Sequence, residues 1–207
     1  MEYAHTVTSC GNELLSIVHS GNKQNKVGVL LVVGGPQYRV GSHRQFVQLA
    51  RMLANNGITT MRFDYTGMGD SSGDKAEFDA IEPDINAGVD ALLSLEPKLN
   101  KIVLWGLCDA ASASLMYAWK DPRISGMVLL NPWLRSDQTM GKTMLKFYYI
   151  QRLLSKDFWQ KLFSGKVNIE ASVKDVKGFA ADSVSSSGSN EKKSYQYKMA
   201  EGFSKFS

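Results

Sequence analysis

The chain has 207 residues, of which 43% are hydrophobic and 21% are charged, and its 24 basic and 20 acidic residues give a formal net charge of +4. This composition is that of a globular protein, and the length suits one hydrophobic core. The basic residues form no long cluster with interleaved aromatic residues, which argues against a nucleic-acid partner. The longest apolar run, residues 27–33, is far too short to span a membrane.

Two cysteines, Cys10 and Cys108, cannot build a disulfide framework, and no Cys/His spacing is typical of a zinc site. The N-terminus has no basic segment followed by an apolar one, so we expect no signal peptide. These features predict a cytoplasmic protein that uses neither a metal nor a cofactor. A Gly-x-Gly pattern at 67–69 follows too late a strand to indicate a dinucleotide site.

Strand-like and helix-like segments alternate through the first 132 residues. Apolar runs predict strands at 14–19, 27–33, 58–64, 101–105 and 124–130. Helical spacing of apolar residues predicts helices at 43–56, 77–95 and 109–119. This alternation is typical of an α/β fold with a mostly parallel sheet and helices on both faces. Ligand sites of such sheets lie at the carboxyl ends of the strands, where we expect Gly35, Asp64, Cys108 and Asn131.

The pattern changes after residue 132. Residues 140–163 are rich in aromatic and basic residues at a spacing that suits amphipathic helices, and residues 182–194 form a Ser-rich polar segment that predicts a flexible linker. A short helix is expected at 193–206. We therefore expect an α/β core at 1–132 and a lid region at 133–207, whose aromatic segment covers the strand ends.

The segment KIVLWGLCDAAS, residues 101–112, places a cysteine between a strand and a helix with small residues around it. This is the layout of a nucleophile elbow, in which a tight turn raises a nucleophile above the sheet. The helix N-terminus would favour the thiolate form of Cys108. The alternative is that Cys108 is a small buried hydrophobic residue, as many free cysteines are.

Acyl transfer at such an elbow also needs donors for the oxyanion. The candidates are the amide of Asp109, directly after the cysteine, and the amide of Gln37 in the glycine-containing loop GGPQYR. Tyr38, Arg39 and His43 in and after this loop are candidates for substrate binding, either as ligands of an anionic group or as ordinary residues that face water.

Three longer motifs carry a resemblance to a known family. They are GGPQYRVGSHRQF at 34–46, RFDYTGMGDS at 62–71 and LWGLCDAAS at 104–112, and NPW at 131–133 and KFYY at 146–149 extend them. Together they resemble the exosortase A system-associated hydrolase of type 1, a bacterial α/β-hydrolase encoded beside exopolysaccharide and protein-sorting genes. The resemblance covers about residues 16 to 165 and implies a helical lid, a cysteine nucleophile at Cys108 and a small ester, thioester or other acyl substrate. Thr66 stands where related hydrolases commonly have an arginine.

The catalytic histidine and acid are where the chain departs from this family. In the family's fold the histidine base follows the last strand, whereas no histidine follows Cys108 here and His43 precedes it. Asp137 is a candidate for an alternative position of the acid. One expectation is an acyl hydrolase that works through Cys108. The other is a truncated, catalytically inactive homologue that serves as a binding module or has no function, with an apolar sheet edge at 127–130 prone to self-association.

Overall fold

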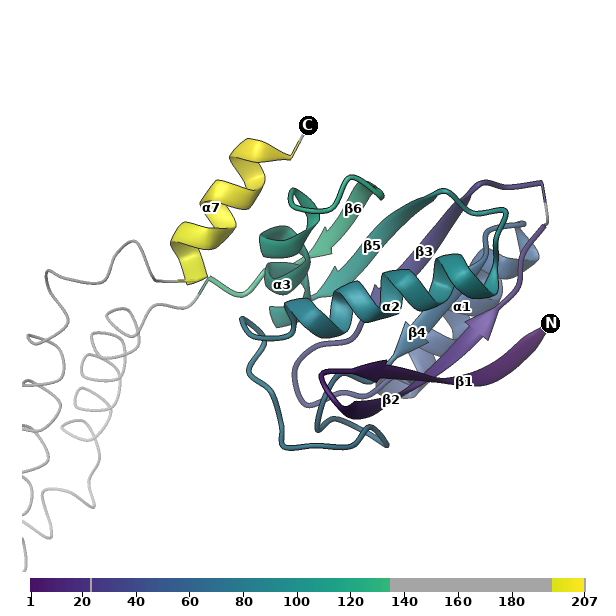
Figure 1. The fold of residues 1–207 in the computed structure, drawn as a ribbon, viewed down its shortest axis with the longest axis horizontal. Coiled ribbons are helices and arrows are strands. Elements are labelled where there is room, and N and C mark those ends of the chain that lie inside the picture. Colours follow the sequence, from purple (N-terminus) through teal and green to yellow (C-terminus); the bar gives the residue numbers. More distant parts are fainter. Residues whose placement is uncertain (23, 135–194, 207) are drawn as a thin grey trace, which may run out of the picture. The chain divides into compact units, whose positions relative to one another are not determined.

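The computed structural model describes residues 1–22, 24–134 and 195–206, and its centre is a six-stranded sheet in the order β1-β2-β4-β3-β5-β6 (Figure 1). The strands are β1 (Glu2–Ser9), β2 (Asn12–His19), β3 (Val27–Val32), β4 (Thr60–Phe63), β5 (Lys101–Leu107) and β6 (Ile124–Leu130). β3, β4, β5 and β6 run parallel, whereas β2 is antiparallel to both β1 and β4. The predicted α/β fold with a mostly parallel sheet is confirmed.

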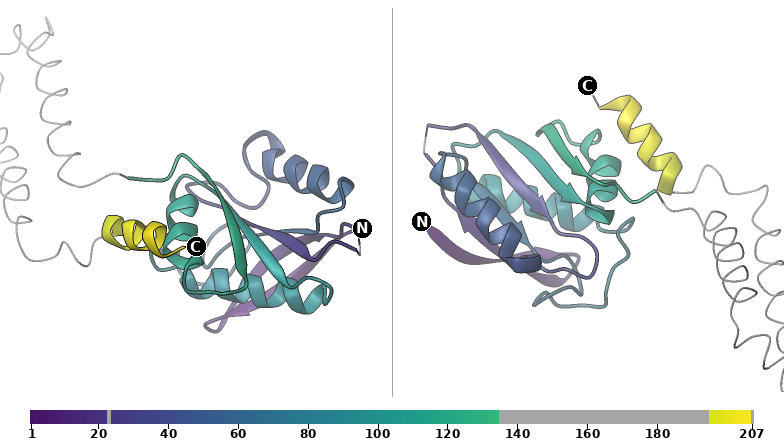
Figure 2. Two further views of the ribbon diagram at one scale, coloured as in Figure 1. Left: turned by 90° about the horizontal axis from the view of Figure 1, so that it is seen from above. Right: turned by 180° about the vertical axis from the view of Figure 1, so that it is seen from behind.

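Helices cover both faces of this sheet, as predicted. The helical elements are the 3-10 turn η1 (Ser42–Arg44), α1 (Gln45–Asn55), α2 (Glu82–Leu95), α3 (Asp109–Ala118) and α7 (Tyr195–Lys205), of which α7 packs on α3. Figure 2 shows α1 on one face and α2 on the opposite face. No helix of the part that the structure describes has the length and apolar character needed to cross a membrane.

The central strand β3 is buried on both faces, which explains its uninterrupted apolar sequence. Leu30 and Val32 belong to the larger core, with Ile85 of α2. Leu31 belongs to the smaller core on the other face, with Phe46 of α1. The parallel strands are therefore packed on both faces of the sheet. The residues that follow their carboxyl ends lie at one edge of the sheet.

Two elements differ from the sequence-based expectation. The helix expected at 77–95 begins at Glu82, with Pro83 in its first turn, where the missing N–H breaks no helical hydrogen bond. β1, for which the sequence predicts no bounds, forms a hairpin with β2. Its turn has φ 47° at Cys10 and φ 83° at Gly11, the two positive values that suit a tight hairpin turn.

The short helix expected at 193–206 is confirmed as α7. Its Gly202 packs on the backbone of α3 so closely that a Cβ would overlap the carbonyl oxygen of Leu115. The ammonium of Lys205 lies 4.2 Å from the ring centroid of Trp119, and Met199 is buried. α7 thus belongs to one compact unit with residues 1–133. The boundary at 132 and the lid stay predictions, and the aromatic and Ser-rich segments lie outside the described residues.

A buried histidine of β2 makes the stability of the fold pH-dependent. Arg62 Nε donates a hydrogen bond to His19 Nε2 at 3.0 Å, and both side chains are buried. Burial, followed by the charge of Arg62, lowers the pKa of His19 from 6.5 to about 4. Between these two pH values His19 therefore binds a proton in the unfolded chain but not in the folded chain. The free energy of unfolding decreases as the pH falls through this range.

We expect the free energy of unfolding to decrease by up to about 3 kcal/mol between pH 6.5 and pH 4 through His19 alone. Urea titrations across this range should show a smaller pH dependence in His19→Gln, which keeps an acceptor for Arg62. His5→Gln, a replacement in β1, is the control and should leave the wild-type dependence unchanged. If the free energy of unfolding depends equally on pH in wild type and His19→Gln, then His19 is not held neutral in the folded chain.

Candidate active site

Cys108 is the junction between β5 and α3 and has φ 61° and ψ −123°. This conformation is rare for a residue with a Cβ and costs about 1–3 kcal/mol, so it needs support from the surrounding structure. A Cβ at Gly106 would lie 2.7 Å from the backbone of Ala110 and Ala111, so glycine alone fits there. The predicted strand–turn–helix geometry with small neighbours is confirmed, and Cys108 is partly exposed.

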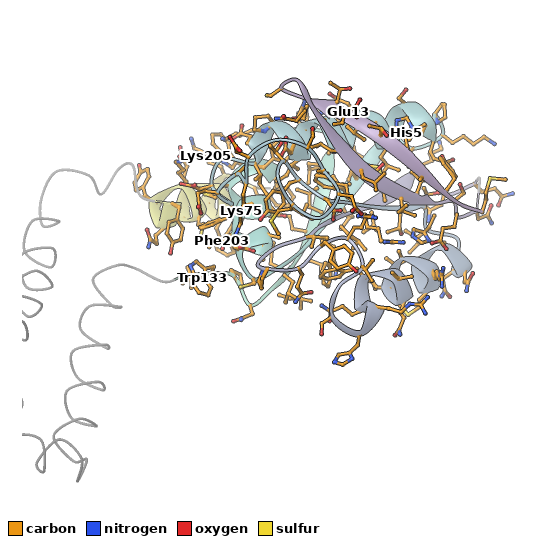
Figure 3. The ribbon with its side chains drawn as sticks, turned by 90° about the horizontal axis from the view of Figure 1, so that it is seen from below. His5, Glu13, Lys75, Trp133, Phe203 and Lys205 are labelled. Carbon is orange, nitrogen blue, oxygen red and sulfur yellow. The ribbon has the colours of Figure 1, made fainter. Side chains whose placement is uncertain are left out.

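Backbone hydrogen bonds hold this turn. The Cys108 N–H donates to the Leu130 carbonyl at 2.9 Å, and the Cys108 carbonyl accepts from Ala111 N–H at 3.1 Å. The Ser112 hydroxyl accepts from the N–H of Trp133 at 2.8 Å and donates to its carbonyl at 3.1 Å. The chain after β6 is thereby fixed beside the turn, so Trp133, labelled in Figure 3, belongs to the candidate site. The sequence could have indicated this role, because Trp133 comes shortly after the end of a predicted strand, where ligand sites of parallel sheets lie.

Two amide groups, one directly after Cys108 and one in the loop after β3, are unpaired within the described residues. Within the described residues the N–H groups of Asp109 and Gln37 have no hydrogen-bond acceptor. In the loop after β3, the Gly35 N–H donates to Asp109 Oδ1 at 2.6 Å and the Arg39 N–H donates to Asp64 Oδ1 at 2.5 Å. Since residue 36 is a proline, the loop between them offers N–H groups at Gln37 and Tyr38 alone.

The side chain of Asp109 holds this loop against α3. A Cβ at Gly34 would overlap Asp109 Oδ1 and would lie 2.6 Å from the amide nitrogen of Ala110. Gly35 has φ 67°, a value that glycine adopts without strain. The glycine pair of the loop therefore allows the close approach that brings the loop and the start of α3 together.

The guanidinium of Arg39 joins two loops of the same edge. It forms ion pairs with the buried carboxylate of Asp64, after β4, and with Asp70 at 2.6 Å. Asp64 Oδ2 also accepts the Asp70 N–H at 3.2 Å, and a Cβ at Gly69 would overlap that carboxylate. The guanidinium of Arg39 is thus engaged in ion pairs that join the two loops. Its predicted contact with substrate stays a prediction.

The other predicted site residues lie around this loop. The Gln37 side chain accepts a hydrogen bond from Gln45 Nε2 at 3.0 Å, which fixes it to α1. Tyr38 is 45% exposed, and His43 is exposed in η1 with φ 50°. Their contacts with substrate stay predictions, and Asp137 lies outside the described residues.

Tyr65 is a residue of this edge that the sequence did not single out. It follows Asp64 and is 3% exposed. Burial, followed by the negative charges of Asp109 and Glu77, raises the pKa of Tyr65 to about 12. Its hydroxyl therefore stays protonated throughout the neutral range.

The two cysteines offer a direct comparison of reactivity. Cys108 lies in the strained turn before α3, next to the free N–H group of Asp109, whereas Cys10 is exposed in the β1–β2 turn. With limiting iodoacetamide at neutral pH we expect peptide mapping to find Cys108 alkylated first, despite its lower exposure. In the unfolded chain the difference should disappear. Faster labelling of Cys10 in the folded chain would contradict the assignment of Cys108 as the nucleophile.

A mostly parallel sheet with a strained turn of this geometry between a parallel strand and a helix is the arrangement of an α/β-hydrolase. Residues 25–188 match the family described as serine aminopeptidase, S33, and the chain belongs to this family of α/β-hydrolases. The superfamily that the sequence resembles is thereby confirmed. No curated protein matches the sequence.

Solved structures support the same fold. The chain is similar to an esterase of Pyrococcus furiosus (TM-score 0.60, 21% identity, covering 70% of this chain and 56% of that one). It is also similar to Est1E of Butyrivibrio proteoclasticus with ferulic acid bound (0.57, 18%, 68% and 57%) and to the α/β hydrolase GrgF of a Penicillium species (0.58, 19%, 74% and 55%). The chain spans less than two thirds of the length of each, and at these identities the likeness establishes the fold.

Proposed function

We propose that the protein is an acyl hydrolase that cleaves esters or thioesters through the thiol of Cys108. The observation that carries this proposal is the strained turn at Cys108 together with the free N–H groups of Asp109 and Gln37. A strained backbone at a cysteine lowers the stability of the fold, and such strain is common at residues that act as nucleophiles in active sites.

The reaction that these groups support has two steps. The Cys108 thiolate attacks the carbonyl carbon, a C–S bond forms, and the carbonyl oxygen becomes an oxyanion between the N–H groups of Asp109 and Gln37. Each donor is worth about 3–4 kcal/mol in comparable sites. The oxyanion then reforms the carbonyl and the leaving group departs, which leaves a thioester on Cys108. Water hydrolyses that thioester and restores the thiol.

The second step needs a base that activates water. His19 is buried against Arg62, and His5 lies in β1. His43 is exposed in η1, before the nucleophile in the chain, and no residue after Cys108 in these 207 residues is a histidine. We therefore expect the chain to release about one equivalent of p-nitrophenol from p-nitrophenyl acetate rapidly and then to turn over slowly. A stopped-flow trace with no burst would favour the inactive homologue. Fast sustained turnover would show that a base is present.

The link to exosortase and exopolysaccharide systems is a further part of the proposal. It is supported by the three motifs of the resemblance, which are distant in the sequence and joined at one edge of the sheet. The Gly35–Asp109 hydrogen bond joins the first motif to the third, and the ion pairs of Arg39 with Asp64 and Asp70 join the first to the second.

We also propose that chains associate through β6. Among the described strands β6 pairs with β5 alone, and its Val128 and Leu130 are 41% and 42% exposed. Apolar strand edges of this kind pair with other chains. Sedimentation analysis should show association that Val128→Lys weakens. Met52→Lys, at an apolar residue of α1 that is 53% exposed, is the matched control and should have no effect. A monomer at all concentrations, or an equal effect of both variants, would contradict this.

A further inference from the structure

The carboxylate of Asp109 is a charged group directly beside the proposed nucleophile. Asp109 is the first residue of α3, it is partly exposed, and its Oδ1 accepts the Gly35 N–H at 2.6 Å. No cation of the described residues forms an ion pair with it, since the salt bridges of this part of the chain involve other carboxylates. One hydrogen bond from a neutral amide holds the carboxylate in place and leaves its negative charge at the site.

Arg39, the cation of the GGPQYR loop, does not compensate this charge. Arg39 is shared between Asp64 and Asp70, so these three groups together carry one negative charge. The buried Tyr65 responds to the same field, because Asp109 and Glu77 are the charges that hinder its ionisation. Among the ion pairs of the described residues, the carboxylate of Asp109 therefore keeps an uncompensated negative charge next to Cys108.

We propose that Asp109 is a specificity-determining residue, which selects acyl substrates with a neutral or cationic group next to the reacting carbonyl and disfavours anionic ones. The proposal rests on Cys108 being the nucleophile. A carboxylate within a few ångströms of a bound anion repels it, and in a partly buried site this repulsion is weakly screened. Holding the carboxylate on the Gly35 amide keeps the charge beside the acyl group.

Charged thiol reagents measure the potential at Cys108 without any need for turnover. In a Cys10→Ser background, Cys108 is treated with a trimethylammonium-ethyl and with a sulfonato-ethyl methanethiosulfonate. In each reaction the thiolate attacks the sulfenyl sulfur, the new disulfide forms and methanesulfinate leaves. The two rates are divided by those of a small free thiol. The ratio of cationic to anionic reagent is then independent of how much of the thiol is ionised.

We expect this normalised ratio of the cationic to the anionic rate to be about five or more in the parent chain. In Asp109→Asn it should fall toward one. The asparagine keeps an oxygen that accepts the Gly35 N–H, so the charge is the main change. Asp90→Asn removes one negative charge from α2, where Asp90 pairs with Arg123, and should leave the ratio unchanged. A ratio near one in the parent chain, or equal ratios in the parent and Asp109→Asn, would overturn the proposal.

The same variants tested with esters separate this inference from the proposed function. We expect the mono-p-nitrophenyl ester of succinic acid to acylate the parent chain more slowly than p-nitrophenyl acetate, relative to the free thiol, and this gap to narrow in Asp109→Asn. If neither ester gives a burst while the reagent ratio behaves as expected, the proposed hydrolase function is wrong. The effect of the Asp109 charge on reactions at Cys108 is then still supported. If both esters give equal normalised bursts, the function stands and the selection by Asp109 is wrong.

Discussion

Cys108→Ala should abolish the burst of p-nitrophenol and reduce acylation to the rate of spontaneous hydrolysis. In the proposed mechanism the Cys108 thiolate forms the covalent bond, and the amides of Asp109 and Gln37 act on an oxyanion that forms after this attack. Without the sulfur they have no oxyanion to stabilise, so the effect on acylation is expected to be at least about a thousandfold. Alanine also fits the space around the turn, so the fold should be retained.

Two further variants give this result its meaning. Cys10→Ala removes the other thiol and should leave the burst intact, because Cys10 lies in the β1–β2 turn. Cys108→Ser should retain a slow reaction at most, because a serine hydroxyl needs an adjacent base far more than a thiol does. A full burst in Cys108→Ala would show that another residue is the nucleophile.

Arg39→Met should destabilise the folded chain by about 3–5 kcal/mol, the range measured when one partner of a buried ion pair is removed. The Asp64 side chain is fully buried and would lose the hydrogen bond that the guanidinium donates to its Oδ2, keeping its backbone donors. The loops after β3 and β4 would lose their common link, so the burst should slow as well. Urea unfolding followed by circular dichroism measures the first effect and stopped-flow acylation the second.

The matched control is Lys120→Met, which breaks the exposed pair of Lys120 with Glu82 and should cost less than about 1 kcal/mol. Adding Asp64→Asn to Arg39→Met removes the unpaired charge and should restore part of the stability. A small effect of Arg39→Met, or no recovery in the double variant, would mean that the pair with Asp64 does not hold these loops.

The parallel half of the fold can be predicted from the sequence because its signals are local. β6 and the start of β5 coincide with apolar runs, and α3 follows Cys108 directly, as the small residues of the turn require. The site at the strand ends follows from topology, since parallel strands present their carboxyl ends at one edge. The bounds of β1 were not predicted, because its alternating pattern is interrupted by polar residues and its strand identity depends on pairing with β2.

The electrostatic arrangement of the site could not be predicted, because its partners are far apart in the sequence. Asp109 lies 74 residues from Gly35, and Arg39 lies 25 residues from Asp64. Nothing in the local pattern distinguishes an arginine that binds substrate from one that joins two loops. The same holds for Asp109, whose position after the cysteine indicates an amide donor and says nothing of where its carboxylate points.

Locating the acyl group after a single turnover tests the central claim most directly. The chain is mixed with p-nitrophenyl acetate, quenched in acid during the burst, digested and mapped by mass spectrometry, with a hydroxylamine-treated sample beside it. We predict one acetyl group on the peptide that contains Cys108, removed by hydroxylamine because a thioester is labile to it. An acetyl group on Cys10, a lysine or a serine, with Cys108 unmodified, would contradict the account.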